Sequence, residues 1–368
     1  MIKCSLVSIA LVFGQALFLQ AQQDASFRRI GTGSQPQVTV DANGIVNITW
    51  GRSDSIFYAT STNGGASFSA PKFVATLKQM HLGMTRGPQI ASSLNYSMIT
   101  AMDKAGNLYS FLLRFATGKW EKIKINDVND SAPEGLMALA ADKQDNFYAV
   151  WLDLRKDSAN NIYFSSFQKG GKSWAKNRVV YTSPDEHVCE CCKPSLAVSG
   201  SKVAVMFRNW VNGSRDLYTI VSENKGQHFS DATKMGEGTW KLKGCPMDGG
   251  GIAFDDSGAI HTVWRREAAI YYCRPQQKEV MIGNGKICSI HAGHGKVLIA
   301  LQDAGSTKLV DVNRNAEVTI GKGAFIKSVF LPDAKVIAVW ENEGEIRYRL
   351  ILPESFHNNK NKMVVSVR

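Results

Sequence analysis

The sequence has no long apolar run beyond its first segment, no dense run of basic residues and almost no helical periodicity. After residue 21, no apolar stretch is long enough to cross a bilayer. The formal net charge is +11, but no Lys/Arg run or arginine-rich arm concentrates it. We therefore expect no membrane span and no nucleic-acid partner. We interpret the charge as scattered surface lysines, although a basic surface also favours anionic glycans.

The first residues have the layout of a secretory signal peptide. Lys3 is followed by an apolar stretch from Ser5 to Leu19 and by a small residue at Ala21. We therefore expect residues 1–21 to be removed on export, and residues 22–368 to form a single secreted or periplasmic domain. We expect this domain to be a monomer.

Internal repeats predict the fold. An apolar strand that ends on a bulky residue recurs seven times, and a second apolar strand precedes each copy. A turn rich in Gly, Asp and Asn joins most of these pairs, as in β-hairpins. A third strand follows each pair, and several copies have a weaker fourth. The bulky residues are Trp50, Met102, Trp151, Phe207, Trp264, Leu301 and Trp340.

These repeats predict an all-β fold, a seven-bladed β-propeller of four-stranded antiparallel blades. A six-bladed propeller is the alternative, if the short segment near Leu301 belongs to a neighbouring blade. The strand that closes the ring comes either from KMVVSV at 362–367 or from residues before Gln35. Either arrangement removes the exposed edge that an open array of sheets would leave.

A small polar turn that ends on an aromatic residue recurs in three of the repeats. It reads STNGGASF at 61–68, FQKGGKSW at 167–174 and SENKGQHF at 222–229. The polar side chain can bind backbone N–H groups, and the glycine (Gly65, Gly171 or Gly226) can take a positive φ. The aromatic ring can pack into the stack of sheets. We interpret the turn as a structural staple.

These turns resemble the Asp-box, or BNR, repeat S-x-D-x-G-x-T-W of sialidases and related secreted propellers. Asn63, Lys169 and Asn224 stand where that family prefers Asp. The resemblance implies a propeller that acts on or binds glycans, with the repeats on the face away from the ligand. Sialidases also use an arginine triad, an Asp acid/base and a Tyr activated by Glu. No Tyr–Glu pair can be assigned here, and FRRIG at 27–31 lies too early to supply the family's first arginine.

We therefore expect a sialidase-like propeller that recognises an acidic or complex glycan, with hydrolysis left open. The alternative is a non-catalytic propeller that binds a protein or a surface polymer. In such a propeller, the loops from second to third strands and those between blades open on one face. The residues there that could bind an anion through forked hydrogen bonds are Arg86, Arg155, Arg208, Asn209, Arg215, Arg265 and Arg266. The candidate acid/base residues are Asp153, Asp216 and Asp248. The alternative for each arginine is an ion pair that braces its own loop.

Four cysteines lie in two short loops, EHVCECCKP at 186–194 and KGCPMDGGG at 243–251. Both loops precede inner strands of neighbouring blades, so we expect them to lie close together. The favoured interpretation is a disulfide from Cys245 to a cysteine of CECC, with no cofactor, and Cys273–Cys288 as a second candidate bridge. The alternative is copper or zinc, although C-x-C-C matches no standard structural zinc spacing. The metal ligands would then be His187, Cys189, Cys191, Cys192, Cys245 and Met247.

Overall fold

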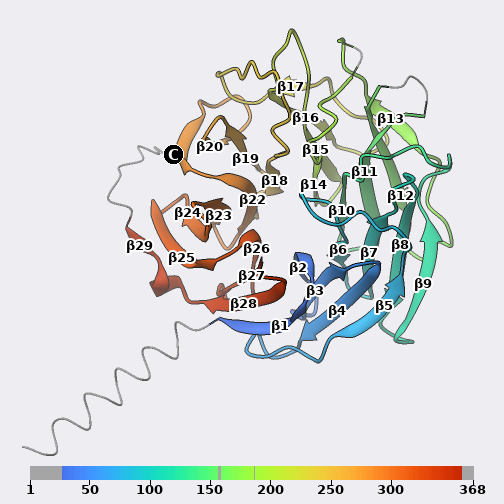
Figure 1. The fold of residues 1–368 in the computed structure, drawn as a ribbon, viewed down its shortest axis with the longest axis vertical. Coiled ribbons are helices and arrows are strands. Elements are labelled where there is room, and N and C mark those ends of the chain that lie inside the picture. The colour runs from blue at the N-terminus through green and yellow to red at the C-terminus, as the bar shows by residue number, and fades with distance from the viewer. Residues whose placement is uncertain (1–26, 156–158, 186, 359–368) are drawn as a thin grey trace, which may run out of the picture.

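The computed structural model describes residues 27–155, 159–185 and 187–358, which form a ring of seven β-sheets (Figure 1). The inner strands of the ring surround a central channel. The sheets follow one another around the ring in chain order. The seven-bladed propeller is therefore confirmed, and the segment near Leu301 is part of a separate blade. The predicted signal peptide lies outside the described residues. Among the described residues, no helix combines the length and apolar character that crossing a membrane requires.

Each blade runs from an inner strand beside the channel to an outer strand at the rim, and neighbouring strands pair in an antiparallel way. Blade 1 contains β2 (Ser34–Val40), β3 (Val46–Arg52), β4 (Ser55–Ser61) and β5 (Lys72–Thr76). Blade 2 contains β6 (Gln89–Ser92), β7 (Tyr96–Met102), β8 (Leu108–Arg114) and β9 (Lys119–Lys124). Blade 3 contains β10 (Met137–Ala141), β11 (Phe147–Asp153), β12 (Asn161–Phe167) and β13 (Arg178–Tyr181). Blade 4 contains β14 (Ser195–Ser199), β15 (Lys202–Arg208), β16 (Leu217–Ser222) and β17 (Thr233–Lys234).

The last three blades follow the same plan. Blade 5 contains β18 (Gly251–Phe254), β19 (Ile260–Arg266), β20 (Ala269–Cys273) and β21 (Val280–Asn284). Blade 6 contains β22 (Lys286–Gly293), β23 (Lys296–Asp303), β24 (Ser306–Asp311) and β25 (Ala316–Lys322), and β29 (His357–Asn358) adds a fifth strand at its rim. Blade 7 contains β26 (Ala324–Phe330), β27 (Val336–Asn342) and β28 (Glu345–Ile351). A short 3-10 helix, η1 (Pro353–Ser355), precedes β29.

The first strand of the chain closes the ring. β1 (Arg28–Thr32) pairs with β28 and becomes the outer strand of blade 7, which then reads β1-β28-β27-β26. The closing strand thus comes from residues before Gln35, the second of the two sequence alternatives. The segment at 362–367 lies outside the described residues. Because the two ends of the ring share one sheet, the first and last blades are held together by backbone hydrogen bonds.

The apolar core is divided among the seven interfaces between neighbouring blades. One buried cluster fills each interface, and the cluster between blades 7 and 1 joins Trp50 and Ile48 to Val339 and Tyr348. Trp50, Trp151 and Trp340 are among the largest fully buried side chains. The bulky end of each second strand is therefore the part of the repeat that fills the space between sheets. Each such side chain contributes about 1.5–3 kcal/mol by leaving water.

The three recurring polar turns join blades 1, 3 and 4 to the blades that precede them. Phe68 of blade 1 packs edge-to-face on Tyr348 of blade 7, with ring centroids 4.7 Å apart. Phe229 of blade 4 does the same on Phe164 of blade 3, at 5.3 Å. The indole N–H of Trp174 in blade 3 donates to Ser110 Oγ in blade 2. These contacts explain why the chain repeats a turn that ends on an aromatic ring.

The glycines of these turns differ from the prediction in one case. Gly65 and Gly226 take positive φ values of 77° and 81°, as expected. In the turn at 167–174, Gly170 is left-handed, with φ of 72°, and Gly171 is not. The other two turns have two consecutive left-handed residues, Gly64–Gly65 and Lys225–Gly226, so this turn keeps only the first of them, although Trp174 still docks on the preceding blade.

Two adjacent glycines of the first turn allow a matched test of this staple. Gly64 and Gly65 both have positive φ, but a Cβ on Gly65 would lie 2.5 Å from Ile337 Cδ1, whereas one on Gly64 would meet nothing within 4 Å. We expect Gly64→Ala to cost about 1 kcal/mol of unfolding free energy from backbone strain alone. Gly65→Ala should cost about 1–3 kcal/mol more, because Ile337 of blade 7 must move. Urea denaturation measures both, and equal losses would show that the turn does not pack on its neighbour.

Candidate functional site

The inner strands of all seven blades line the central channel. The channel has a volume of about 820 Å³, with side chains from β2, β6, β10, β14, β18, β22 and β26 on its wall. The loops that enter each blade reach the start of its inner strand, and the hairpin turns after the inner strands lie at the other end. We call the end where the inner strands begin the mouth. Gln35, Gln89, Lys193, Asp248 and Lys327 line the channel toward this end.

Two lysines project into the channel without a carboxylate partner. Lys193 Nζ donates to Gln89 Oε1, and within the described chain neither Lys193 nor Lys327 forms an ion pair with an acidic side chain. Burial lowers the pKa of Lys193 well below its usual value, and the charge of Lys327 lowers it further. Burial also lowers the pKa of Lys327, against the opposing effects of Cys288 and Asp248. The channel therefore holds two lysine side chains whose protonated forms an anion would stabilise.

Several of the arginines predicted to bind an anion have acceptors within the chain itself. Arg155 donates to Asp153 and Asp127, and Arg266 forms an ion pair with Glu279. Burial alone would lower the pKa of Arg155, but the hydrogen bonds and charges of Asp153 and Asp127 raise it above its usual value. Arg86 pairs with Glu134 at 3.5 Å, and Arg265 Nε donates to the Glu267 carbonyl at 2.6 Å.

Arg208 is the most deeply buried of these arginines, with 1% of its surface exposed. Its guanidinium donates to the backbone carbonyls of Asp248, Arg265 and Arg215. It therefore joins the loops of blades 4 and 5 at the mouth. The adjacent Asn209 is also buried, and its amide donates to the Tyr181 hydroxyl at 2.6 Å.

The three predicted acid/base residues are buried and accept hydrogen bonds from the surrounding chain. Asp153 accepts from Ser131, the Trp151 indole and Arg155. Asp216 accepts from the Trp240 backbone N–H and from Thr239 Oγ1, and pairs with Lys234. Asp248 Oδ2 accepts from the Ile287 backbone N–H at 2.7 Å. The structure brings Asp248 to the channel wall, whereas Asp153 and Asp216 brace the ends of their own blades.

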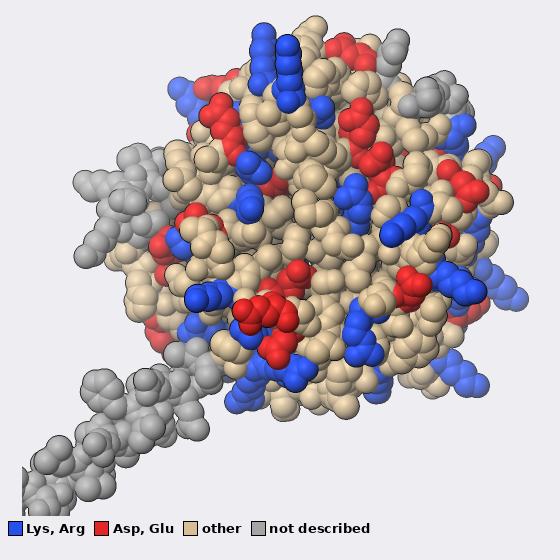
Figure 2. All heavy atoms as spheres, in the orientation of Figure 1, with Lys and Arg blue, Asp and Glu red and all other residues tan. Residues whose placement is uncertain are grey.

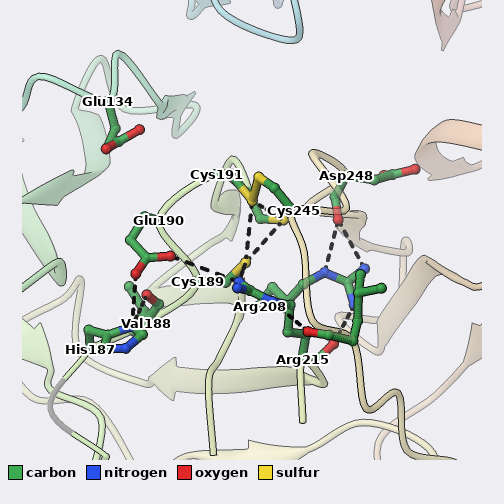
Figure 3. Close-up of a disulfide and its surroundings, with 12 residues drawn as sticks. Glu134, His187, Val188, Cys189, Glu190, Cys191, Arg208, Arg215, Cys245 and Asp248 are labelled. Carbon is green, nitrogen blue, oxygen red and sulfur yellow. Dashed lines mark hydrogen bonds and ion pairs between the residues drawn. A yellow bond between two sulfur atoms is a disulfide. The ribbon is translucent and has the colours of Figure 1, made fainter. Parts of the chain in front are cut away.

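Two glutamates that the sequence analysis did not select reach the mouth. Glu134 precedes the inner strand of blade 3, and Glu190 lies within CECC before blade 4 (Figure 3). Burial raises the pKa of Glu134, with the charge of Arg86 opposing and that of Glu190 reinforcing this shift. Glu190 pairs with His187 at 3.2 Å, and the His187 ring stacks on Trp210. Their position in loops that enter a blade is the sequence signal by which they could have been found.

The cysteine-rich loops meet at the mouth, as predicted. Cys191 of the loop before blade 4 forms a disulfide with Cys245 of the loop before blade 5 (Figure 3). This confirms a bridge from Cys245 to CECC. The second candidate bridge, Cys273–Cys288, is wrong. Both are free thiols, and they belong to the clusters on opposite faces of the blade 5 sheet, so that sheet separates them.

The remaining cysteines of CECC are reduced and buried behind the disulfide. Cys189 Sγ lies 3.4 Å from Cys192 Sγ and 3.7 Å from Cys191 Sγ. The hydrogen bond with Cys192 lowers the pKa of Cys189 to about 7, against the effect of burial and together with the charges of Arg215 and Arg208. Burial raises the pKa of Cys192 well above its usual value.

The same sulfur atoms bear on the metal alternative. The ligand atoms of Cys189, Cys191 and Cys192 lie within 4.8 Å of one another, a spacing that one ion could bridge. Cys191 and Cys245 are joined to each other, however, and an oxidised cysteine offers no thiolate ligand. In this state two thiols remain, which is fewer than a closed structural site needs. Copper or zinc held by these residues with His187 and Met247 stays a prediction.

The charge is dispersed on the face shown in Figure 2, where Lys and Arg alternate with Asp and Glu and no patch of one sign dominates. On this face the arrangement agrees with scattered surface lysines.

No family model matches the sequence, and no curated protein matches it. The structure, in contrast, is similar to solved propellers. It aligns with an ulvan lyase, described as a new family of polysaccharide lyase bound to -[GlcA(1-4)Rha3S]-, with a TM-score of 0.56 and 11% identity over 89% of this chain and 95% of that one. It aligns with a lectin from Burkholderia pseudomallei, with a TM-score of 0.56 and 9% identity over 88% of this chain and 100% of that one. A Hadza microbial sialidase gives a TM-score of 0.51 and 10% identity over 90% of this chain and 69% of that one. At these identities the likeness shows the fold alone.

Proposed function

We propose that this chain is an exported propeller that binds an acidic glycan at the mouth of its channel. The observation that carries the proposal is the pair of channel lysines, Lys193 and Lys327, which have no carboxylate partner among the described residues. Uronic acid and sulfate groups are anions that such ammonium groups can bind directly. The Cys191–Cys245 disulfide supports export, because disulfides persist in oxidising compartments.

Two further observations support a glycan as the ligand. The structural neighbours include an ulvan lyase, a lectin and a sialidase, whose names all refer to carbohydrates or to proteins that bind them. The polar turns at 61–68, 167–174 and 222–229 resemble the Asp-box repeat of secreted sialidase-like propellers. Their aromatic residues pack between blades, away from the channel, which agrees with a structural role in that family.

Binding, and not hydrolysis, is the activity that the geometry supports best. Asp153, Asp216 and Asp248 are buried and accept hydrogen bonds from the surrounding chain, which supports a structural role for these three carboxylates more than contact with a sugar. If the chain also cleaves its ligand, we assign the general acid to Glu134, because its pKa is raised and it reaches the mouth.

The test compares one polysaccharide in two charge states. The chain should bind a uronic-acid polysaccharide at least about tenfold more tightly than the same polymer with its carboxyl groups reduced to alcohols, because only the acid pairs with the lysines. Titration calorimetry at two salt concentrations measures this, and the affinity for the acidic form should fall as salt rises. Equal affinity for both polymers would contradict the proposal. A reducing-end assay in the same samples reports cleavage. If the unaltered chain cleaves the polymer and Glu134→Gln does not, the chain hydrolyses its ligand as well as binding it.

A further inference from the structure

The four cysteines of the mouth form an outer, exposed pair and an inner, buried pair. Cys245 is exposed and Cys191 is partly exposed, and these two form the disulfide. Cys189 and Cys192 are 0% and 1% exposed and lie directly behind it. A disulfide that only ties two loops together needs two cysteines. The two reduced sulfurs in contact with this one therefore require a separate explanation.

The contacts among the sulfur atoms favour exchange. Cys189 Sγ is 3.7 Å from Cys191 Sγ, a near-contact distance from which a thiolate can attack a disulfide. Arg215 Nη1 lies 2.9 Å from Cys189 Sγ, so a positive charge faces the sulfur that would carry the negative charge (Figure 3). Cys192 Sγ lies 3.4 Å from Cys189 Sγ, close enough to complete a second bond.

We propose that the four cysteines form a thiol–disulfide exchange site, in which the disulfide moves between the exposed pair Cys191–Cys245 and the buried pair Cys189–Cys192. The substrate class is a thiol or disulfide of a small molecule or an exported protein, which reacts at the exposed pair. The inference is independent of the ligand bound in the channel.

The exchange balances without an added oxidant or reductant. In the first step the Cys189 thiolate attacks Cys191 Sγ, the Cys191–Cys245 bond breaks, and Cys245 leaves as a thiolate that takes a proton from water. In the second step Cys192 gives its proton to water and attacks Cys189 Sγ, and Cys191 leaves as the thiolate. One disulfide and two thiols are present before and after. The product presents Cys191 and Cys245 as a surface dithiol, which can reduce an external disulfide. The Cys191–Cys245 bond then forms again while Cys189–Cys192 is still oxidised, and two electrons from an external thiol return Cys189 and Cys192 to the reduced state.

The exchange also affects the mouth. The Cys191–Cys245 bond is the covalent link between the loops that enter blades 4 and 5, and Glu190 lies between two of the cysteines. When the bond moves to the buried pair, this link is released while the fold of both blades is unchanged. The redox state of an external partner thereby determines whether the loops of the candidate site are covalently linked.

The first test uses the unaltered protein. The full chain is equilibrated in glutathione buffers of graded redox ratio, quenched in acid, alkylated and mapped by mass spectrometry of its non-reduced peptides. Both disulfides should appear, with the Cys189–Cys192 form at roughly a tenth or more of the protein at some ratio. If only the Cys191–Cys245 form and the fully reduced form appear at every ratio, the proposal is wrong.

Two variants and a control sharpen the result. In Cys245→Ser, the disulfide should re-form between Cys189 and Cys192 under the same oxidising buffer. In Cys189→Ser, alkylation of Cys245 by iodoacetamide without reductant should slow by about tenfold or more, because the exchange that exposes this thiol is blocked. Cys273→Ser should behave like the unaltered protein, since Cys273 lies in another cluster. A stoichiometric zinc or copper ion in protein purified without chelators, with Cys189 and Cys192 protected from alkylation, would overturn exchange in favour of metal binding.

Discussion

Arg208→Ala should lower the free energy of unfolding by about 3–5 kcal/mol, the largest loss of stability that we expect from a single change at the mouth. The Arg208 guanidinium is 1% exposed and donates to the carbonyls of Asp248, Arg265 and Arg215. Removing it leaves these buried acceptors without a donor, and each unsatisfied group costs about 1–3 kcal/mol. It also removes the cation that lies 5.3 Å from the Trp240 ring.

The measurement is urea denaturation followed by tryptophan fluorescence. Arg208→Lys should also be destabilised, because one ammonium cannot replace a planar group that reaches three carbonyls. Arg265→Ala is the matched control: Arg265 lies at the same end of the next blade, but its side chain donates only to the nearby Glu267 carbonyl among the hydrogen bonds described. We expect this control to cost less than about 1 kcal/mol. An Arg208→Ala protein with unchanged stability and weakened glycan binding would show that Arg208 is a ligand residue and not a brace.

Arg208 and the strand repeats differ in how much of their environment the local sequence records. The seven second strands carry a local signal, an apolar run that ends on a bulky residue such as Trp50 or Trp340, and the structure places these residues between blades. Arg208 was predicted to bind an anion because it ends a second strand, where the loops open on one face of the propeller. No sequence pattern records that three carbonyls from two blades converge on it.

The channel lysines were missed for the opposite reason. Lys327 lies within AFIKSVF, where a lysine between apolar residues indicates the solvated side of a strand. In a closed ring, however, one side of each inner strand faces the channel, where solvent is restricted. Lys193 directly follows the last cysteine of CECC, and the cysteines of that loop were selected as candidate site residues in its place. Ring closure by β1 was left open for a related reason, since RRIGT is short and is ordered by pairing with β28.

Replacing the two channel lysines should weaken binding and stabilise the fold at the same time. The double variant Lys193→Gln, Lys327→Gln should bind the uronic-acid polysaccharide about 100-fold more weakly, since each charge-assisted hydrogen bond is worth roughly 1.5–3 kcal/mol. Its unfolding free energy at neutral pH should nevertheless rise, because burial lowers the pKa of both lysines and the protonated forms are disfavoured in the folded state. Lys335→Gln is the control, because Lys335 pairs with Asp333 in the hairpin turn between β26 and β27, at the other end of the channel.

The pH dependence separates this explanation from a simple loss of surface charge. Between the lowered pKa of the folded state and the usual lysine value of about 10.4, the unfolded chain binds more protons than the folded chain, so stability rises with pH. The unaltered protein should therefore gain stability through this range, and the double variant should gain less. Binding of the acidic polysaccharide should weaken over the same range, because the neutral amines no longer attract an anion. Titration calorimetry and urea denaturation across this pH range measure the two effects. If affinity and stability change in Lys335→Gln and stay unchanged in the double variant, the anion binds elsewhere, and the channel lysines only line the wall.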